Sequence, residues 1–203
     1  MPFEKSSAIA PDVFAGEYKA KVLRALDTLD LQGIAQAIEI LQEARTQQRH
    51  IFVCGNGGSA STASHFVTDL VKGASYGRDR RFRIQALTDS LSTITAYAND
   101  VSFDAIFAEQ LKNHAAPGDL VLCISGSGNS PNVLAAAQTA RQLGCRIIAL
   151  TGRDGGKLAP LADLNIAVGH PHMGRIEDAH LIVCHMIAYG FMDAAPASSP
   201  AAA

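Results

Sequence analysis

The sequence predicts an α/β fold, a three-layer domain in which helices cover both faces of a parallel sheet. Short apolar segments alternate along the chain with longer segments whose apolar residues recur at helical spacing. The short segments are almost continuously apolar, which is typical of parallel strands buried on both faces. Three of them run into loops rich in glycine or serine, at residues 55–61, 125–130 and 151–156. Because ligands bind beyond the carboxyl ends of parallel strands, these loops are the first candidates for a binding site.

Two helices are expected before the first strand. Apolar residues recur at helical spacing over residues 12–30, and the pattern repeats over residues 31–47. These helices can cover the sheet or pair with a second subunit, and neither carries a catalytic signature.

The first strand is expected at residues 51–54, a short apolar run bounded by glycine. The three glycines of the loop that follows allow positive φ and let the backbone come close to a ligand. Ser59 or Ser61 is expected to cap the next helix, over residues 61–72. The N-terminus of such a helix presents free N–H groups and is a natural anion site.

The remaining elements continue the alternation of strand and helix. Ser130 is expected to cap a helix that has Pro131 in its first turn. Further strands are expected at residues 82–87, 120–125, 146–150 and 164–168, and further helices over residues 88–99, 103–113, 131–143 and 175–192.

Composition bounds the class of protein. The chain has 203 residues, 48% of them hydrophobic, and a net charge of −2 without any block of lysine or arginine. This predicts one domain over residues 1–193 and argues against binding to nucleic acid or to a membrane surface. No apolar run is long enough to span a membrane, and the four cysteines lack C-x-x-C spacing, so a reduced, cytoplasmic protein is expected. Residues 194–203 are of low complexity and are expected to be disordered.

Two loops allow other interpretations. Residues 55–60 formally fit the dinucleotide fingerprint, but the acidic residue that should end the next strand is missing, since Asp79 precedes that strand and Asp89 follows it too late. A tight turn without a ligand is the other alternative there. Residues 152–158 resemble a Walker loop that is one residue short, with Leu158 in place of the magnesium-binding hydroxyl. We therefore reject a nucleotide triphosphatase and interpret this loop as the entry to a helix.

Residues 125–130 place several serine hydroxyls at the N-terminus of a second helix, where hydroxyl and backbone N–H groups can hold a phosphate monoester. Two such loops in one sheet favour a shared phosphorylated ligand over two plain turns. His65 and Asp69 lie four residues apart on one helix, and Glu177 and His185 lie eight apart on another. These four groups suit a metal site or acid–base chemistry if they converge, whereas core or capping roles are the alternative.

These motifs, taken with residues 54–59, 99–100, 150–157 and 175–180, resemble the sugar isomerase (SIS) domain family and, more narrowly, the phosphoheptose isomerases. The resemblance covers residues 12–193. It implies a flavodoxin-like sheet of five parallel strands and the conversion of sedoheptulose 7-phosphate to a heptose 7-phosphate. It also implies a homotetramer whose active sites lie between subunits.

The resemblance further implies the residues of the site. Zinc or another divalent metal is expected on His65, Asp69, Glu177 and His185, with Asp69, Glu177 and His185 as the catalytic groups. The expected contacts with the sugar phosphate are Asn56, Gly57, Gly58, Ser59, Asn99, Asp100, Ser125, Gly126, Ser127 and Ser130.

Three positions depart from the family pattern. Asp69 replaces the usual glutamate, Glu177 the usual glutamine, and Gly126 a common threonine. A carboxylate shortened by one methylene shifts by about 1 Å or more, which either disables the base or passes its role to Glu177, with His185 as the acid. Alternatively, two histidines and two carboxylates form a divalent metal site. The altered acids also leave open a regulator that binds a partner protein, such as a replication initiator, or an isomerase of another sugar phosphate.

Overall fold

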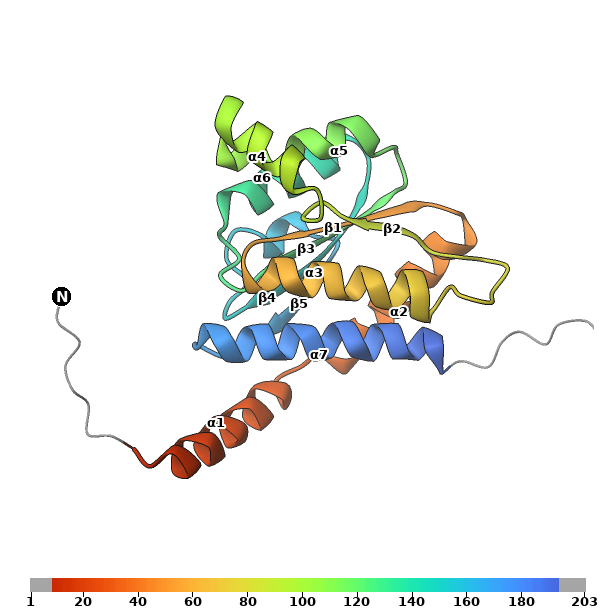
Figure 1. Ribbon diagram of the computed structural model, residues 1–203. Coiled ribbons are helices and arrows are strands. Elements are labelled where there is room, and N and C mark those ends of the chain that lie inside the picture. The colour runs from red at the N-terminus through yellow and green to blue at the C-terminus, as the bar shows by residue number, and fades with distance from the viewer. Residues whose placement is uncertain (1–8, 194–203) are drawn as a thin grey trace, which may run out of the picture.

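Five parallel strands form one sheet in the computed structural model, which describes residues 9–193 (Figure 1). The strand order is β2-β1-β3-β4-β5, so the chain reverses direction across the sheet between β1 and β3. This order is the flavodoxin-like arrangement, and the predicted fold class is confirmed. The strands are β1 His50–Gly55, β2 Arg83–Ala86, β3 Leu120–Ser125, β4 Arg146–Gly152 and β5 Leu164–Val168.

Helices cover both faces of the sheet, and successive side chains along each strand point alternately to one face and to the other. In β1, Ile51 and Val53 face one core with α2, α3 and α7, whereas Phe52 and Cys54 face a second core with α5 and α6. Both cores are apolar, which explains why the strands are almost continuously hydrophobic. The helices are α1 Pro11–Leu26, α2 Leu31–Thr46, α3 Gly58–Thr68, α4 Leu91–Asp100, α5 Ala108–His114, α6 Pro131–Gln142 and α7 Met173–Met192.

Helices α3 and α7 lie side by side and run in the same direction along one face (Figure 1). Near their beginnings, the Glu177 carboxylate lies against Gly58, where an added Cβ would come within 2.7 Å of the carboxylate carbon. Near their ends, Gly73 lies against the Met192 thioether. Both helices begin at the carboxyl edge of the sheet, so the seam between them leads from the loops down the side of the molecule.

Helix α3 starts earlier than predicted and ends differently. Its N-cap is Gly57, with φ 56° and no side-chain cap, so the expected capping by Ser59 or Ser61 is wrong, and both serines lie inside the helix. Glycine suits this position because the backbone there is unfavourable for other residues. After Thr68 the helix widens into one π turn, Asp69–Gly73, and such turns are frequent at functional sites.

The loop after β4 does not open an α-helix, which corrects the prediction for residues 151–156. Only a short 3-10 turn, Ala159–Leu161, separates β4 from β5. Gly155 and Gly156 both have positive φ, and the chain uses them to fold this loop back against residues 125–130. Helix α4 ends at Asp100, so that Asn99 and Asp100 are its last two residues.

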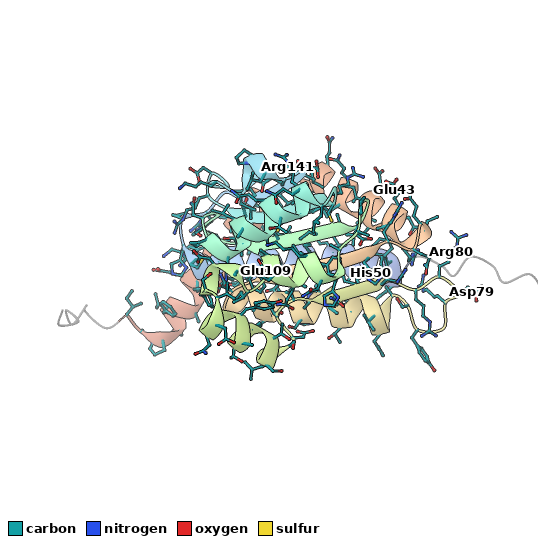
Figure 2. The ribbon with its side chains drawn as sticks, turned by 90° about the horizontal axis from the view of Figure 1, so that it is seen from above. Glu43, His50, Asp79, Arg80, Glu109 and Arg141 are labelled. Atoms are coloured by element: carbon teal, nitrogen blue, oxygen red, sulfur yellow. The ribbon has the colours of Figure 1, made fainter. Side chains whose placement is uncertain are left out.

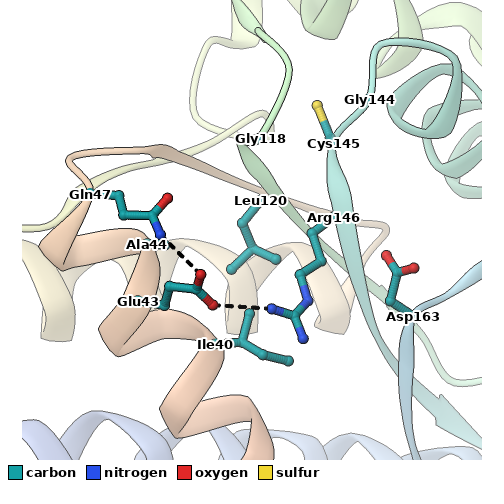
Figure 3. A pocket seen from close by; sticks show the side chains of 10 residues that line it. All are labelled: Ile40, Glu43, Ala44, Gln47, Gly118, Leu120, Gly144, Cys145, Arg146 and Asp163. Atoms are coloured by element: carbon teal, nitrogen blue, oxygen red, sulfur yellow. Dashed lines mark hydrogen bonds and ion pairs between the residues drawn. The ribbon is translucent and has the colours of Figure 1, made fainter.

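A hollow of about 500 Å³ lies at the amino ends of β3 and β4, far from the glycine and serine loops (Figure 3). Its polar groups bind one another: Glu43 pairs with Arg146 at 3.3 Å and accepts a hydrogen bond from Gln47. None of the predicted site residues lines it, and ligands of such sheets bind at the opposite edge. We therefore do not assign it to the active site.

The outer surface carries charges of both signs, together with exposed apolar side chains such as Phe14 and Leu91. Exposed side chains such as Glu43, Arg80 and Arg141 project from the helices and loops (Figure 2). Among residues 9–193, no helix combines the length and the apolar character that crossing a membrane requires. The predicted disordered tail, residues 194–203, lies outside the described residues.

Candidate active site

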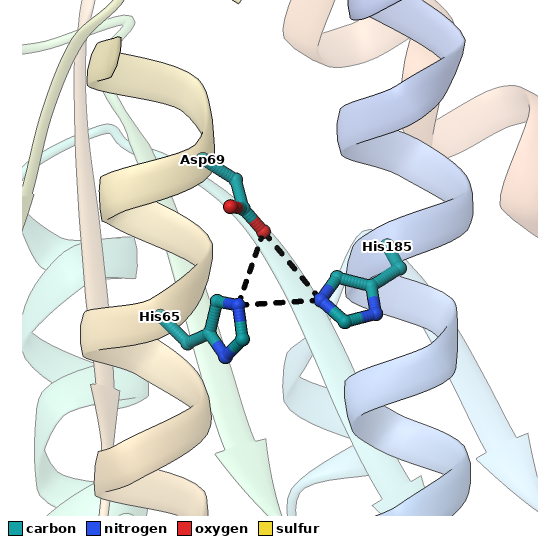
Figure 4. Close-up of side chains that lie close together, drawn as sticks. All are labelled: His65, Asp69 and His185. Carbon is teal, nitrogen blue, oxygen red and sulfur yellow. Dashed lines mark hydrogen bonds and ion pairs between the residues drawn. The ribbon is translucent and has the colours of Figure 1, made fainter. Parts of the chain in front are cut away.

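Three of the four predicted metal and acid–base residues meet in the seam between α3 and α7 (Figure 4). Asp69 Oδ2 lies 3.6 Å from Nε2 of His65 and 3.6 Å from Nε2 of His185, and the two imidazole nitrogens are 3.3 Å apart. His65 and His185 are about half-exposed, whereas the Asp69 side chain is only 19% exposed. The cluster is therefore closed on the side of the carboxylate and open on the side of the histidines.

Asp69 reaches both histidines although it is shorter than the glutamate of the family pattern. It is the first residue of the π turn, and its Oδ2 is buried without a hydrogen-bond partner among the described residues. A buried carboxylate oxygen without a partner is costly, and such groups are commonly explained by a proton, an ion or a catalytic role. This atom is the focus of the site.

The surroundings of the cluster are apolar on the inner side. Burial, with a smaller contribution from Asp69, raises the pKa of the Cys184 thiol, so that the thiol stays protonated. Cys184 thus acts as a small apolar residue rather than as a nucleophile or a metal ligand. On the outer side, the Tyr189 ring contacts His185 edge-on, with ring centres 6.0 Å apart. Both neighbours restrict the His185 side of the site.

Glu177 lies outside this three-residue cluster. Its carboxylate packs against Gly58 at the first turn of α3, two turns before His185 on α7. A Cβ at position 58 would displace this carboxylate, so the contact as it stands depends on glycine. The partial positive charge of the α3 N-terminus favours an anion at this place. Glu177 therefore faces the glycine loop, while His65, Asp69 and His185 lie further along the seam.

The glycine loop, residues 55–58, follows β1 at the carboxyl edge. A Cβ on Gly55 would come within 2.8 Å of the Ser59 side chain and 2.9 Å of the Ile124 carbonyl oxygen, so glycine is required there for close packing. Gly57 has open space around its Cα, and its backbone is accessible. Ser59 is buried in the first turn of α3, and its N–H donates to the Asn56 carbonyl oxygen. The accessible parts of this loop are Asn56 and the next two glycines.

The serine loop, residues 125–130, gathers hydroxyl groups at the start of α6. Ser125 Oγ lies 3.1 Å from Ser130 Oγ and 3.5 Å from Ser127 Oγ. Ser130 is the N-cap residue as predicted, but its hydroxyl makes no capping hydrogen bond. The hydroxyls therefore converge on one point beside the helix N-terminus, an arrangement suited to a phosphate.

The glycines of the serine loop allow it to pack closely. Gly128 has positive φ, and a Cβ there would collide with the Gly155 carbonyl oxygen. At Gly126 an added Cβ would lie 2.6 Å from the Met173 sulfur. Position 126 therefore lacks room for the threonine common in the family unless the Met173 side chain moves.

Asn99 and Asp100 are exposed at the end of α4, and their side chains bind each other: Asn99 Nδ2 donates to Asp100 Oδ1 at 2.7 Å. Neither shares a hydrogen bond or ion pair with the cluster or the serine loop among the described contacts. Within one chain, these two predicted residues are not brought to the other site residues.

The sequence analysis missed Asn132. Its side chain is 1% exposed and pairs with Asn56 across the sheet. The amide follows Pro131 at the start of α6, and no local pattern in the sequence marks a partner 76 residues away.

Comparison with known proteins identifies the family of this chain. The model of the SIS domain matches residues 16–152. A phosphoheptose isomerase from Citrifermentans bemidjiense is 41% identical over 82% of this chain and 86% of its own length. Another, from Aliarcobacter butzleri, is 38% identical over 89% and 94% of the two chains. The structure of a phosphoheptose isomerase from Neisseria gonorrhoeae superposes with a TM-score of 0.84 at 32% identity, covering 91% of this chain and all of that one.

The fold and the family match thus define an α/β sugar isomerase (SIS) domain, in which two histidines and one carboxylate cluster in the seam between α3 and α7. By the family match and by these relatives, the chain belongs to the SIS domain family and, within it, to the phosphoheptose isomerases. The predicted resemblance is confirmed, and the protein is a sugar-phosphate isomerase.

Proposed function

We propose that this protein interconverts sedoheptulose 7-phosphate and a heptose 7-phosphate. The names of its relatives support this substrate class, and the arrangement of Asp69 supports the chemistry. The observation that carries the proposal is the buried Oδ2 of Asp69, which has no hydrogen-bond partner among the described residues and lies 3.6 Å from an imidazole nitrogen on either side. Aldose–ketose isomerisation needs such a group to move a proton between adjacent carbons.

The three clustered residues take complementary roles. Asp69 acts as the base that removes the proton from the carbon next to the carbonyl and returns it to the neighbouring carbon. His185 acts as the acid that supplies a proton to the carbonyl oxygen, since its Nε2 lies beside the carboxylate. Burial of Asp69 excludes water from the proton that it carries, which favours return of that proton to the substrate.

The cluster fits a divalent metal, and we propose zinc. Two imidazole nitrogens and one carboxylate oxygen lie within 4.8 Å of one another, and three such ligands with one open position are typical of catalytic zinc. His65, Asp69 and His185 would hold the ion, with Glu177 as the further carboxylate of the site. With the ion bound, the His185 nitrogen would be a ligand and no longer the acid, whereas Asp69 would keep its second carboxylate oxygen as the base. A bound metal supplies a Lewis acid that polarises the substrate carbonyl.

The two loops hold the remainder of the substrate. We assign the phosphate to the hydroxyls of Ser125, Ser127 and Ser130 and to the N-terminus of α6. The sugar lies along residues 56–59, where Glu177 adds a negative charge that disfavours a second phosphate. The substrate is thereby oriented with its carbonyl end toward the seam between α3 and α7.

Assembly is the second part of the proposal. Helix α4 buries none of its residues within the chain, and α1 leaves Val13, Phe14 and Leu23 at least half-exposed. Both helices project from the body of the molecule (Figure 1). Exposed apolar helices of this size are typical of subunit interfaces. We propose a homotetramer whose subunits bring Asn99 and Asp100 to the other site residues.

We also propose that the protein is cytoplasmic. Four free, buried cysteines are typical of a chain that folds in a reducing compartment.

Incubation with sedoheptulose 7-phosphate, followed by NMR detection of the aldose, tests the activity. We expect turnover with zinc present, loss of turnover with a chelator, and recovery when zinc is returned. Absence of turnover under all three conditions contradicts the proposed substrate.

Elemental analysis tests the metal independently of turnover. We expect one zinc per active site in the wild-type protein, little in His65→Ala and the wild-type amount in the matched control His114→Ala, whose side chain is exposed on α5. Equal, negligible zinc in all three proteins contradicts the metal site.

A further inference from the structure

We infer that Asn132 is a positioning residue that fixes the amide of Asn56 and the spacing between the glycine and serine loops; the inference rests on the proposed function. Asn56 directly follows β1, and Asn132 is the second residue of α6, which follows β3. These two strands are neighbours at the point where the strand order reverses. The pair therefore joins the two ligand loops across the crevice in which the substrate is expected.

The two amides make reciprocal hydrogen bonds. Asn56 Nδ2 donates to Asn132 Oδ1 at 2.7 Å, and Asn132 Nδ2 donates to Asn56 Oδ1 at 2.8 Å. Two parallel bonds define both the distance and the mutual orientation of the side chains. Because Asn132 is only 1% exposed, water does not compete for these bonds.

A third bond sets the orientation of the pair. The backbone N–H of Val133 donates to Asn132 Oδ1 at 2.9 Å, so that this atom must be the oxygen of the amide. The nitrogen of Asn132 then faces Asn56, which in turn must present its oxygen. The fold at the start of α6 thus determines which way the amide of Asn56 points.

The pairing leaves part of Asn56 available. An asparagine amide has two N–H donors and two acceptor lone pairs, and the pair with Asn132 uses one of each. Asn56 is half-buried, and the next residue in the chain, Gly57, is exposed. The remaining N–H and lone pair are therefore held ready for hydroxyl groups of the sugar, without the amide rotation that a free asparagine would undergo.

Asn132→Asp gives the sharpest test. Above neutral pH its carboxylate faces the Asn56 oxygen, so that the Asn56 amide loses one bond and turns. As the pH falls, the protonated acid donates an O–H to that oxygen and restores the reciprocal pair. We expect kcat/KM about 10- to 100-fold below wild type at pH 8, with a ratio to wild type that rises toward pH 5.5.

Matched variants separate positioning from folding. Thr139→Val alters another buried side chain of α6 without touching either loop, and its kcat/KM should equal that of wild type. Asn132→Ala and Asn56→Ala should each raise KM, and the double variant should be little worse than the poorer single variant. The inference is overturned if Asn132→Ala has the wild-type kinetics expected of Thr139→Val. It is also overturned if the effects of Asn132→Ala and Asn56→Ala add fully in the double variant, or if kcat/KM of Asn132→Asp relative to wild type does not rise at low pH.

Calorimetric binding of sedoheptulose 7-phosphate distinguishes this inference from the proposed function. Wild type that binds but does not turn over, with weaker binding to Asn132→Ala, contradicts the isomerase activity and supports the role of Asn132. Wild type that turns over, with unchanged affinity and turnover in Asn132→Ala, supports the activity and overturns the role. Wild type that neither binds nor turns over the sugar contradicts both.

Discussion

At the scale of single residues, the most informative contrast lies between the two carboxylates that depart from the family pattern. Asp69 is buried between two imidazoles, whereas Glu177 lies against a helix N-terminus. We expect Asp69→Asn to lower kcat about 100- to 10,000-fold, because the amide cannot accept the substrate proton. Glu177→Gln should retain most of the activity, since glutamine is the usual family residue there. Steady-state kinetics measures kcat of both variants. An equal decrease in kcat for Asp69→Asn and Glu177→Gln would contradict the different roles that we give the two carboxylates.

His180 provides a pH prediction. Its ring is 1% exposed, Nε2 lies 2.9 Å from the Thr151 carbonyl oxygen, and Nδ1 has no partner among the described residues. Burial lowers the pKa of this histidine, so that the unfolded chain binds a proton that the folded chain does not. Stability is then retained above a pH of about 6.5 and falls as the pH drops below it, by at most about 1.4 kcal/mol per pH unit.

Replacement of His180 by glutamine removes this titration and keeps a donor for Thr151. Urea unfolding between pH 7.5 and pH 5 should therefore show a shallower loss of stability in His180→Gln than in wild type. The exposed His114→Gln serves as the control and should follow wild type. If His180→Gln lost stability with falling pH as steeply as wild type, the loss could not be due to protonation of His180.

At the scale of elements, the seam between α3 and α7 depends on glycine. Gly58→Ala places a Cβ within 2.7 Å of the Glu177 carboxylate, which must turn away from the α3 N-terminus, and should destabilise the protein by up to about 1 kcal/mol. The double variant Gly58→Ala, Glu177→Ala should lose less free energy of unfolding than the two single variants together, because the added Cβ no longer meets a carboxylate. Chemical denaturation measures all three free energies of unfolding.

Gly16 in α1 is the matched control. It has open space around its Cα, so Gly16→Ala should stabilise the helix by about 1 kcal/mol. If Gly58→Ala were as well tolerated as Gly16→Ala, the close contact between α3 and α7 would be contradicted.

The elements themselves were largely predictable, and their ends were not. The strands at 120–125 and 164–168 coincide with β3 and β5, because continuous apolar runs bounded by turns leave little choice. The start of α3 was missed because Ser59 and Ser61 satisfy the usual capping rule, whereas the N-cap residue is Gly57, whose positive φ favours glycine at that position.

The candidate site was predictable only in part. Spacing places His65 and Asp69 on one helical face, but only the tertiary fold brings His185 to them from 120 residues away. Likewise, no local pattern in the sequence indicates that Asn132 pairs with Asn56, 76 residues away. The π turn at Asp69, which accompanies the shorter carboxylate, depends on packing of α3 that no single-sequence pattern encodes.

At the scale of the whole molecule, α1 offers the clearest test of assembly. Phe14 is 57% exposed within the chain, and we propose that a second subunit covers it. Phe14→Asp should shift the protein to a smaller assembly, because a buried carboxylate without a partner is unfavourable. Size-exclusion chromatography with light scattering measures the change. Lys19→Asp, an exposed substitution on the same helix, is the control, and an unchanged mass for Phe14→Asp contradicts this interface.

The place of the histidine cluster has a consequence for heat stability. His65 stands on the first helix after β1 and His185 on the last helix of the described chain, so an ion shared between them would cross-link two helices that are far apart in the sequence. Zinc at about 100 times its dissociation constant should add about 2.7 kcal/mol to the free energy of unfolding and raise the melting temperature by about 5 to 10 °C. His65→Ala should lose this rise while His114→Ala keeps it. A chelator would then lower the melting temperature as well as stop turnover. The size of that decrease would measure how much zinc the protein had bound.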